Sequence, residues 1–399
     1  MTEWREVTIE ELAEKIAMGP FGSDIKVETF KPCGVPIISG KHLHETRMRD
    51  KGFNFISEEH ADKLSNANVF RGDVIFTHAG NIGQVSFIPE NSKYERYVIS
   101  QRQFYLRCNS NVLDYEFIAY YFKSPYGQYQ LLANANQTGV PSLAQPVSYL
   151  KSIKVLLPPL TEQKAIAEVL SSLDDKIDLL TRQNKTLEDL AQAYFRKWFI
   201  EDASKEWEVV PISKKFDVLL GGTPSRKIES YWTNGTIGWI NSGKINEFRI
   251  IEASEYITEE ALNNSSAKLL PAGTTVLAIT GATLGKISMV LRSFAANQSV
   301  IGLVPKAELS NNFIFLWLKE NINALISMQT GGAQQHINSN DVKSFDVIVP
   351  DTVALSLFRR KIDPLMLKIS QNCFQINTLN KLRDTLLPKL ISGEIRVKM

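Results

Sequence analysis

The strongest constraint on the fold is that the chain contains the same sequence pattern twice. The segment WREVTIEELAEKI, which starts at Trp4, returns as WEVVPISKKFDVL from Trp207. Further matches follow in the same order: Ser-Gly-Lys at 39–41 and 242–244, GDVIFTHAGNIGQVS at 72–86 and GTTVLAITGATLGKIS at 273–288, FIAYYFK at 117–123 and FIFLWLK at 313–319, QTG at 137–139 and 329–331, and LKSIKVLLP at 150–158 and VKSFDVIVP at 342–350. A duplicated unit of about two hundred residues is too long for a solenoid repeat, so we expect two tandem domains.

Length and charge agree with this division. The chain has 399 residues, and a single hydrophobic core stops growing near ~250–300 residues. The net charge is only +2, which excludes a uniformly basic coat for nucleic acid and leaves local patches as the alternative.

Cysteine and histidine usage excludes several classes of site. Cys33, Cys108 and Cys373 lie far apart, which argues against a disulfide framework and a cysteine zinc site. His42 and His44 have no third ligand nearby, so no metal is expected. The start has no signal-peptide pattern, and no apolar run is long enough to span a membrane. We therefore expect a soluble, cytoplasmic protein that makes no membrane contact.

Each unit begins with short β-type runs, such as VPIIS and DVIFTH in the first and IGWIN and TTVLAIT in the second. A helix is expected around 114–133, and its counterpart around 310–328. The first three-quarters of each unit is thus a mixed α/β domain.

The last quarter of each unit has a 3.5-residue period, which is typical of a coiled coil. In the first unit the seam contains Ile166, Leu170, Leu173, Ile177, Leu180, Asn184, Leu187, and then Ala191, Tyr194 and Trp198. In the second unit it contains Phe358, Ile362, Leu365, Ile369, Asn372, Ile376 and Leu379, followed by Arg383, Leu386 and Leu390.

These patterns predict two long helices that pair with each other. We expect the first helix to have Thr161 as its N-cap and to span ~60 Å at ~1.5 Å per residue. After a short first piece, the second helix should restart with Asp363 as N-cap and Pro364 as first helical residue, and Gly393 should end it. An antiparallel pair would relate the two units by a pseudo-twofold axis. Because a buried Asn usually costs stability, Asn184→Leu is expected to raise the melting temperature.

Four motifs give the chain a resemblance to a known family. They are LPPLTEQKAIAEVLSSLDDKI at 157–177, AQAYFRKWF at 191–199, GGTPSRKIESYW at 221–232 and LLPKLISGEI at 386–395. With these motifs the chain resembles the specificity (S) subunit of type I restriction-modification systems over essentially its whole length. The second helical region departs from the first, because it begins VALSLFRRKI and lacks the EQK of 162–164.

The resemblance implies an α+β protein with two target recognition domains, each followed by a conserved helical region. The boundaries are 1–157 and 204–350 for the recognition domains, and 158–203 and 351–399 for the helical regions. Each domain would read one half of an asymmetric, two-part site in double-stranded DNA. The subunit would recruit two adenine methyltransferase subunits and two ATP-driven translocase-nuclease subunits. S-adenosylmethionine, ATP and Mg²⁺ would be used by those partners, and this chain would have no catalysis and no cofactor of its own.

The residues also argue against catalysis. The chain has no Asp/Asn-Pro-Pro-aromatic motif for adenine methylation, and its nearest approach to a phosphate-binding loop, Gly281 to Ile287, is one residue short. Two other hypotheses are a solitary site-specific nuclease or methylase, and a purely structural tether. The first lacks its motifs, and the second gives no reason for donor-rich loops that diverge between repeated domains.

Polar loops between strands are the candidate DNA contacts, because Lys and Arg neutralise phosphates while Arg, His, Asn and Gln can bind base edges. A glycine turn that serves backbone geometry is the alternative for each loop. The candidates in the first domain are Lys41, His42, His44, Arg47, Arg49, Thr77, His78, Asn81, Gln84, Gln101, Arg102, Gln137 and Thr138. Those in the second are Lys244, Arg249, Thr280, Thr283, Lys286, Asn297, Gln298, Gln334, Gln335 and His336.

Overall fold

The computed structural model describes residues 4–22, 24–136, 139–306, 308–328 and 336–397. It divides into two compact units, and both take residues from both long helices. Unit 1 comprises residues 1–176 and 380–399, and unit 2 comprises residues 177–379. The expected boundaries at the ends of the helical regions therefore do not coincide with the compact units.

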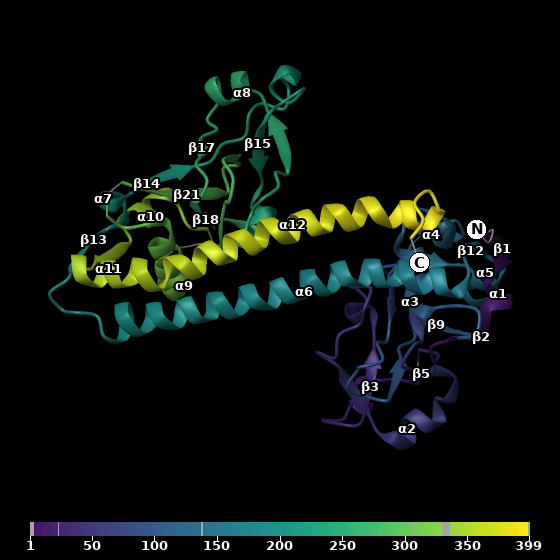
Figure 1. Cartoon of the computed structure of the whole chain (residues 1–399). Helices are drawn as coiled ribbons and strands as arrows, with labels where there is room; N and C mark the ends of the chain where they lie inside the picture. The colour runs from purple at the N-terminus through teal and green to yellow at the C-terminus, as the bar shows by residue number, and fades with distance from the viewer. Residues whose placement is uncertain (1–3, 23, 137–138, 307, 329–335, 398–399) are drawn as a thin grey trace. The chain divides into compact units, whose positions relative to one another are not determined.

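Unit 1 contains two four-stranded sheets and two small ribbons (Figure 1). The first sheet is antiparallel, in the order β2 (Ala13–Met18), β9 (Gln103–Cys108), β6 (Val74–Thr77), β7 (Val85–Phe87). The second has the order β4 (Asn54–Ile56), β3 (Val35–Ile38), β8 (Arg96–Ile99), β5 (Asn68–Phe70), with β3 and β8 parallel. The ribbons pair β1 (Arg5–Thr8) with β12 (Lys154–Leu157), and β10 (Ala135–Asn136) with β11 (Ser142–Leu143).

Unit 2 repeats this topology. Its antiparallel sheet has the order β14 (Phe216–Leu220), β21 (Val300–Pro305), β18 (Thr275–Ala278), β19 (Ile287–Met289). Its mixed sheet has the order β16 (Glu255–Ile257), β15 (Ile237–Ile240), β20 (Phe294–Ala296), β17 (Leu269–Leu270). A ribbon pairs β13 (Glu208–Pro211) with β22 (Asp346–Val349). The repeat inferred from sequence is thus a repeat of fold.

In each unit one helix packs on the antiparallel sheet, and shorter helices and turns form other connections. Those of unit 1 are α1 (Ile9–Leu12), α2 (Glu58–Lys63), α3 (Tyr115–Lys123), α4 (Pro125–Leu132) and α5 (Pro146–Ser152), with short 3₁₀ turns η1 (Val27–Thr29), η2 (Gly40–His42) and η3 (Ser65–Ala67). Those of unit 2 are α7 (Ile212–Lys215), α8 (Glu259–Asn263), α9 (Asn311–Ser327) and α10 (Ser339–Ser344), with η5 (Glu229–Tyr231), η6 (Ser242–Asn246) and η7 (Gly281–Thr283).

An extra residue near the start of unit 1 changes the spacing of the repeat. A β-bulge between Ala13 and Lys15 puts an extra residue into β2, while β14 pairs without interruption. Equivalent positions are therefore 203 residues apart before the bulge and 202 apart just after it, where Ile38 corresponds to Ile240. The repeated letters Ser-Gly-Lys, which match at a spacing of 203, are displaced by one position in the structure.

The helix expected around 114–133 is two helices. Ser124 ends α3, and its side chain caps α4, which starts at Pro125. Proline disfavours a helical conformation in the residue before it, which explains the break. The counterpart α9 has no proline and is continuous over Asn311–Ser327.

The first long helix, α6, spans Leu160–Arg196 and continues as the π-helical turn η4 (Lys197–Glu201). The prediction that Thr161 is its N-cap is wrong. The amides of Glu162 and Gln163 donate to the carbonyl of Pro159, so Thr161 lies inside the first turn. The second helical region is α11 (Thr352–Lys361) followed by α12 (Asp363–Ser392). The restart at Asp363-Pro364 and the end at Gly393, whose φ is 76°, are confirmed. The N-cap assignment of Asp363 is wrong, because Asp363 is the first residue of α12 and the Met366 amide donates to the carbonyl of Ile362 before it.

Contacts inside unit 2 show that the two helices pair antiparallel. Asn184 of α6 contacts Asn372 and Cys373, while Phe195 and Phe199, further along α6, contact Phe358 of α11. The seam is largely buried. Ile166, Leu170, Leu180, Asn184, Phe358, Ile362, Ile369 and Asn372 are buried, and Leu173, Ile177, Leu187, Leu365, Ile376 and Leu379 are half-buried.

The last part of the α6 seam differs from the sequence pattern. Ala191, Phe195 and Phe199 are buried, whereas Tyr194 is exposed and Trp198 only half-buried. Four-residue steps keep this face of α6 on the unit 2 core, where Phe195 and Phe199 pack on Phe313 of α9. Tyr194 and Trp198 instead stack on each other with ring centroids 5.0 Å apart.

Tryptophan side chains fix the first strand of each unit. In unit 1 Trp4 donates to Glu162 at the start of α6, and Arg396, near the end of the chain, pairs with the same carboxylate. In unit 2 Trp207 donates to Asp351 at 3.2 Å. The residues after α12 therefore complete unit 1.

Candidate nucleic-acid interface

Three of the polar loops predicted in the first domain converge in the structure. Thr77 donates to Gln84 Oε1 at 3.1 Å and accepts from Gln103 Nε2 at 3.4 Å. Gln84 Nε2 lies 3.5 Å from His44 Nδ1, which joins the 39–49 loop to this network. Residues that are far apart in sequence thus form one polar surface, with Thr77 and Gln103 buried beneath it. The expected direct DNA contact of Thr77 does not fit this burial.

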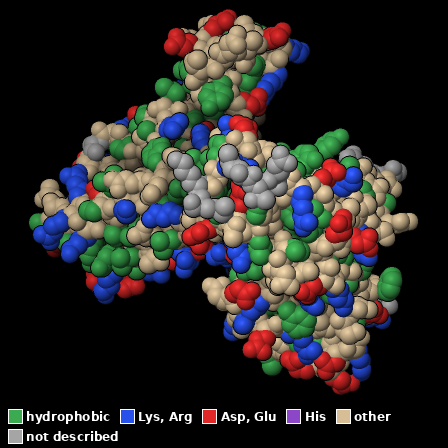
Figure 2. Space-filling view, turned by 45° about the vertical axis from the view of Figure 1, so that its right-hand side comes forward, with side chains coloured by type: hydrophobic (Ala, Val, Ile, Leu, Met, Phe, Trp, Pro, Cys, Tyr) green, Lys and Arg blue, Asp and Glu red, His purple; other side chains and the backbone are tan. Residues whose placement is uncertain are grey.

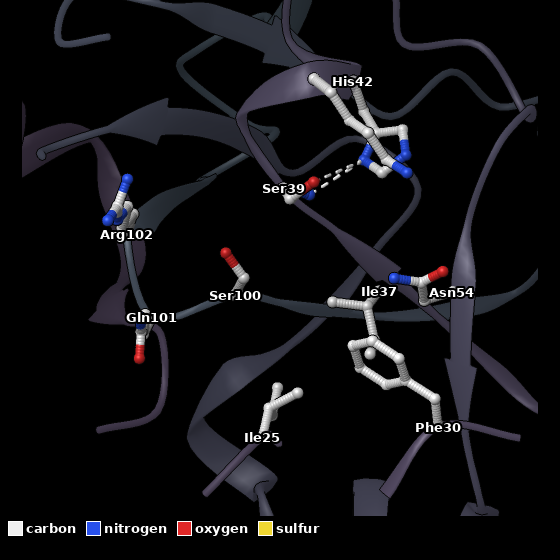
Figure 3. Close-up of a pocket in the computed structure, with 10 residues that line it drawn as sticks. Ile25, Phe30, Ile37, Ser39, His42, Asn54, Ser100, Gln101 and Arg102 are labelled. Carbon is white, nitrogen blue, oxygen red and sulfur yellow. Dashed lines mark hydrogen bonds between the residues drawn. The ribbon is translucent and has the colours of Figure 1, made fainter. Parts of the chain in front are cut away.

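A cavity of about 240 Å³ opens beside these loops (Figure 3). Ile25, Phe30 and Ile37 form its apolar side, while polar and basic side chains, including Lys41 and Arg102, line the rest. None of the described residues that line it is acidic. A wall with cations and no carboxylate suits a ligand that carries negative charge.

Lys41, His44, Asn81, Gln101 and Arg102 are exposed, as DNA contacts require. Within the described parts of the chain, the side chains of Lys41, Asn81, Gln101 and Arg102 have no hydrogen-bond or salt-bridge partner. Such side chains can contact phosphates or bases without first breaking an internal bond.

The two half-buried histidines of this region hold the loops together. His42 Nδ1 accepts from the Ser39 amide at 2.9 Å, and its Nε2 lies 3.3 Å from the Gly52 carbonyl. His78 Nε2 lies 3.0 Å from the Gln101 carbonyl. The two carbonyl partners place a proton on Nε2 of each ring, while burial lowers the pKa of both histidines and so favours the neutral form. Their first role is therefore loop geometry rather than phosphate binding.

Arg47 and Arg49 are both engaged within the domain. Arg47 Nη1 lies 2.7 Å from Asp175 Oδ1 on α6, and Arg49 pairs with Glu45. Both arginines are half-buried, so each can still reach solvent, at the cost of its carboxylate contact.

The second domain brings its corresponding loops together through η6 and η7, which pack against each other. Lys244 pairs with Glu247 at 2.7 Å and takes the place that His42 has in unit 1. Lys286, Gln298 and His336 are exposed, while Thr280, Thr283 and Asn297 are half-buried. Gln298 accepts from Thr223 at 2.6 Å, and Thr280 forms a β-bridge with His336.

Arg249 is the clear correction among the predicted contacts. Its side chain is 1% exposed and faces Glu188 of α6, with Nη1 and Oε1 separated by 3.7 Å. Burial lowers the pKa of its guanidinium. A side chain enclosed in this way cannot reach DNA, so the prediction that Arg249 contacts DNA is wrong.

Four predicted residues, Gln137, Thr138, Gln334 and Gln335, lie outside the described residues. Sequence reasoning also missed Asn54, an exposed strand residue on the cavity wall that has no internal side-chain partner in the described structure. No local signal could have found it, because Asn54 reaches the cavity only through the pairing of β3 with β4.

On the face in Figure 2, basic and acidic side chains are both present and do not form a coat of one sign, which agrees with the net charge of +2. Among the described residues, no group of three or more His, Cys, Asp or Glu side chains could hold a metal ion. None of the described helices has the length and apolarity needed to cross a membrane.

Comparison with known proteins finds the same family in the sequence matches described here. A family model described as the type I restriction modification DNA specificity domain matches residues 1–189 and 204–354. The specificity subunit of the type I restriction enzyme MjaIX of Methanocaldococcus jannaschii is 26% identical over 99% of this chain and 94% of that protein. The HindI specificity subunit of Haemophilus influenzae is 21% identical over 82% of this chain and 87% of that protein.

Among solved structures, the type I restriction-modification S subunit from M. genitalium has the same fold. The TM-score is 0.60 at 19% identity, over 99% of this chain and 96% of that one.

Proposed function

Because this chain belongs to the family of type I restriction-modification DNA specificity subunits, which recognise DNA sequence and are not themselves catalytic, we propose that each of its two domains reads one half of a bipartite, asymmetric DNA site. The main support for this proposal is that the two domains have the same topology but different side chains at equivalent positions of their loops. His42 and the exposed Arg102 in unit 1 stand where unit 2 has Lys244 and Ser299. A shared scaffold with different side chains on its loops suits two readers of different half-sites.

In the first domain, the cavity of Figure 3 would take part in reading. Lys41 and Arg102 would contact phosphates, while Ile37 and Phe30 would accept an apolar base edge such as a thymine methyl group. Lys41→Ala and Arg102→Ala should each weaken binding about equally for all sequences. Each should also reduce the salt dependence of binding by roughly one counterion.

The long helices would dock the partner subunits and set the unread spacer between the half-sites. We propose two adenine methyltransferase subunits, which use S-adenosylmethionine, and two translocase-nuclease subunits, which use ATP and Mg²⁺. Supporting this, α6 carries exposed apolar residues on one stripe, Leu179, Leu190 and Tyr194, at spacings of three turns and one turn. A stripe of this kind suits a partner helix.

Exchanging one recognition domain tests the proposal that each domain reads its own half-site. Replacing residues 205–350 with the recognition domain of a related subunit should change only one half of the methylated site in cells that also express the methyltransferase. Sequencing of methylated adenines reads the outcome. A change in both half-sites in an assembled complex would contradict the proposal.

Lengthening the helices tests the spacer. Seven residues added to both helices keep the heptad phase and extend them by ~10 Å at ~1.5 Å per residue. DNA rises ~3.4 Å per base pair, so the preferred spacer should grow by about three base pairs. This also rotates one half-site by roughly 100°, so weaker binding should accompany the new spacing. A library of sites with every spacer length measures this, and an unchanged preference would show that the helices do not set the spacer.

A further inference from the structure

The inner end of a predicted reading loop in the second domain is held by a buried charge cluster. We call residues 241–249 the domain 2 loop; it contains η6 and ends at Arg249. The Arg249 guanidinium lies over the rings of Phe248 and Phe315, 4.6 and 4.4 Å from their centroids. Its Nη1 donates to the Phe248 carbonyl at 2.7 Å, and its Nη2 is buried without a hydrogen bond.

The acid of this cluster comes from a different part of the chain. Glu188 lies on α6, before domain 2 begins, and its side chain is only 7% exposed. Its Oε1 faces Arg249 Nη1 at 3.7 Å and accepts from Lys319 Nζ of α9 at 2.7 Å. One buried carboxylate of the helix therefore binds two cations of domain 2, one of which ends the loop.

The same two cations recur in the first domain. Arg47 corresponds to Arg249, because the residues that follow them, Met48 and Ile250, donate to the equivalent carbonyls of β7 and β19. Lys123 corresponds to Lys319 in the repeated helix sequence, and its Nζ donates to the His44 carbonyl in the 39–49 loop at 3.2 Å. Both domains therefore use Arg and Lys at matching positions, although the tips of the loops differ. If the two domains read different DNA sequences, residues that they share are expected to position the loop on the domain and not to select particular bases.

We infer that Arg249 is a positioning residue for DNA recognition. Together with Lys319 it fixes the domain 2 loop on Glu188, and so determines where the loop tip, including Lys244, meets the DNA. A recognition domain that occupies the second position must then present an arginine and a lysine to this carboxylate. The inference rests on the proposed function, because it assumes that the loop reads a half-site.

The test uses the full chain in complex with its methyltransferase subunits and measures methylation across a library of two-part sites. Arg249→Met should lower selectivity at the second half-site by about tenfold or more, which corresponds to losing one good base contact. Selectivity at the first half-site should stay unchanged and provides the internal control. Lys306→Met, which removes an exposed pair with Asp217 in the same domain, is the matched control and should leave both half-sites as they are.

A helix variant separates positioning from general damage. Glu188→Gln changes no residue of domain 2, yet it should broaden the same half-site, and Arg249→Lys should restore part of the selectivity that Arg249→Met loses. All measurements are made well below the melting temperature of each variant. If Arg249→Met fails to fold, the inference is tested on Arg249→Lys and Glu188→Gln, which keep a charge or the side-chain shape.

Two negative results have different meanings. If the wild-type complex methylates no two-part site, the proposed function fails. If it does, and folded variants at Arg249 and Glu188 select the second half-site as the wild type does, positioning by this cluster is overturned.

Discussion

The two equivalent arginines, Arg47 and Arg249, occupy the same place in a repeated fold but differ in burial. Arg47 is 36% exposed and pairs with Asp175, a carboxylate that is itself 60% exposed. Arg249 and Glu188 are 1% and 7% exposed. Water screens the first pair, so its contribution should be small. The second pair is desolvated, and removing either partner leaves an uncompensated buried charge. Repetition of sequence therefore preserves the position of an interaction without preserving its energy.

The largest effect should come from removing the buried acid. Glu188→Leu leaves Arg249 and Lys319 without their carboxylate, and should lower the free energy of unfolding of unit 2 by ~3–5 kcal/mol. Asp175→Leu, the matched change in unit 1, should cost less than ~1 kcal/mol. Denaturant unfolding with hydrogen exchange assigns each loss to its unit. Equal costs would show that burial does not distinguish the two pairs.

The paired helices of unit 2 provide the next largest effect. Asn372 Nδ2 donates to Asn184 Oδ1 and to Gln183 Oε1, both at 2.9 Å, while its own Oδ1 is buried without a partner. This pairing reverses the sequence-based expectation for Asn184→Leu. The single change should lower stability by ~1–3 kcal/mol, because it strands polar atoms of Asn372.

The double variant, Asn184→Leu with Asn372→Leu, removes both polar groups and should be more stable than either single variant. Thermal unfolding of the three variants tests this. A single Asn184→Leu variant more stable than wild type would restore the original expectation and contradict the paired arrangement.

A smaller effect is expected at Arg47, whose partner Asp175 is exposed. Arg47→Met should reduce stability by only ~0.2–1 kcal/mol, because the pair with Asp175 is open to solvent. The loss should shrink at high salt, since exposed pairs are screened. Unfolding curves at low and high salt measure it, with Lys63→Met, which breaks the exposed pair with Glu59, as the control. A loss of stability as large as that of Glu188→Leu would mean that the Arg47–Asp175 and Arg249–Glu188 pairs contribute equally to stability.

The smallest expected difference is in how the stabilities of unit 1 and unit 2 respond to a fall in pH. Burial lowers the pKa of His42 and His78 below the unfolded value of ~6.5, and nearby Lys41 and Arg102 act in the same direction. The stability that their neutral forms provide is complete above the unfolded value, and it is lost as the pH falls from that value through the lower folded-state pKa of each ring. Unit 2 has Lys244 and Ile279 at these positions, so neither histidine has a counterpart there.

Unit 1 should therefore lose protection from hydrogen exchange between pH 7.5 and 5.5 more than unit 2 does. His78→Ile, which installs the unit 2 residue, should reduce the difference. An identical response of both units would exclude the histidines as its source.

Part of the site was predictable and part was not, for a physical reason. The loops that contain Lys41, Asn81 and Arg102 were found because runs of donors between strands have no place in a core, and these side chains are exposed. The prediction that Arg249 contacts DNA was wrong, because an arginine in such a loop can also face inward when a buried carboxylate, here that of Glu188, lies beneath it. His42 and His78 were assigned to DNA, yet their ring nitrogens bind backbone groups that only the fold brings near.

The sequence by itself determined the duplication, the short strands of each unit, the long paired helices and the restart at Asp363-Pro364. All of these depend on periodicity and local backbone preference, which neighbouring residues set. Only the tertiary structure decided that Glu188 of α6 meets Arg249 and Lys319, and that Asn184 and Asn372 bind each other. Those outcomes depend on which distant side chains share a desolvated space, and desolvation is a property of the packed molecule rather than of any segment.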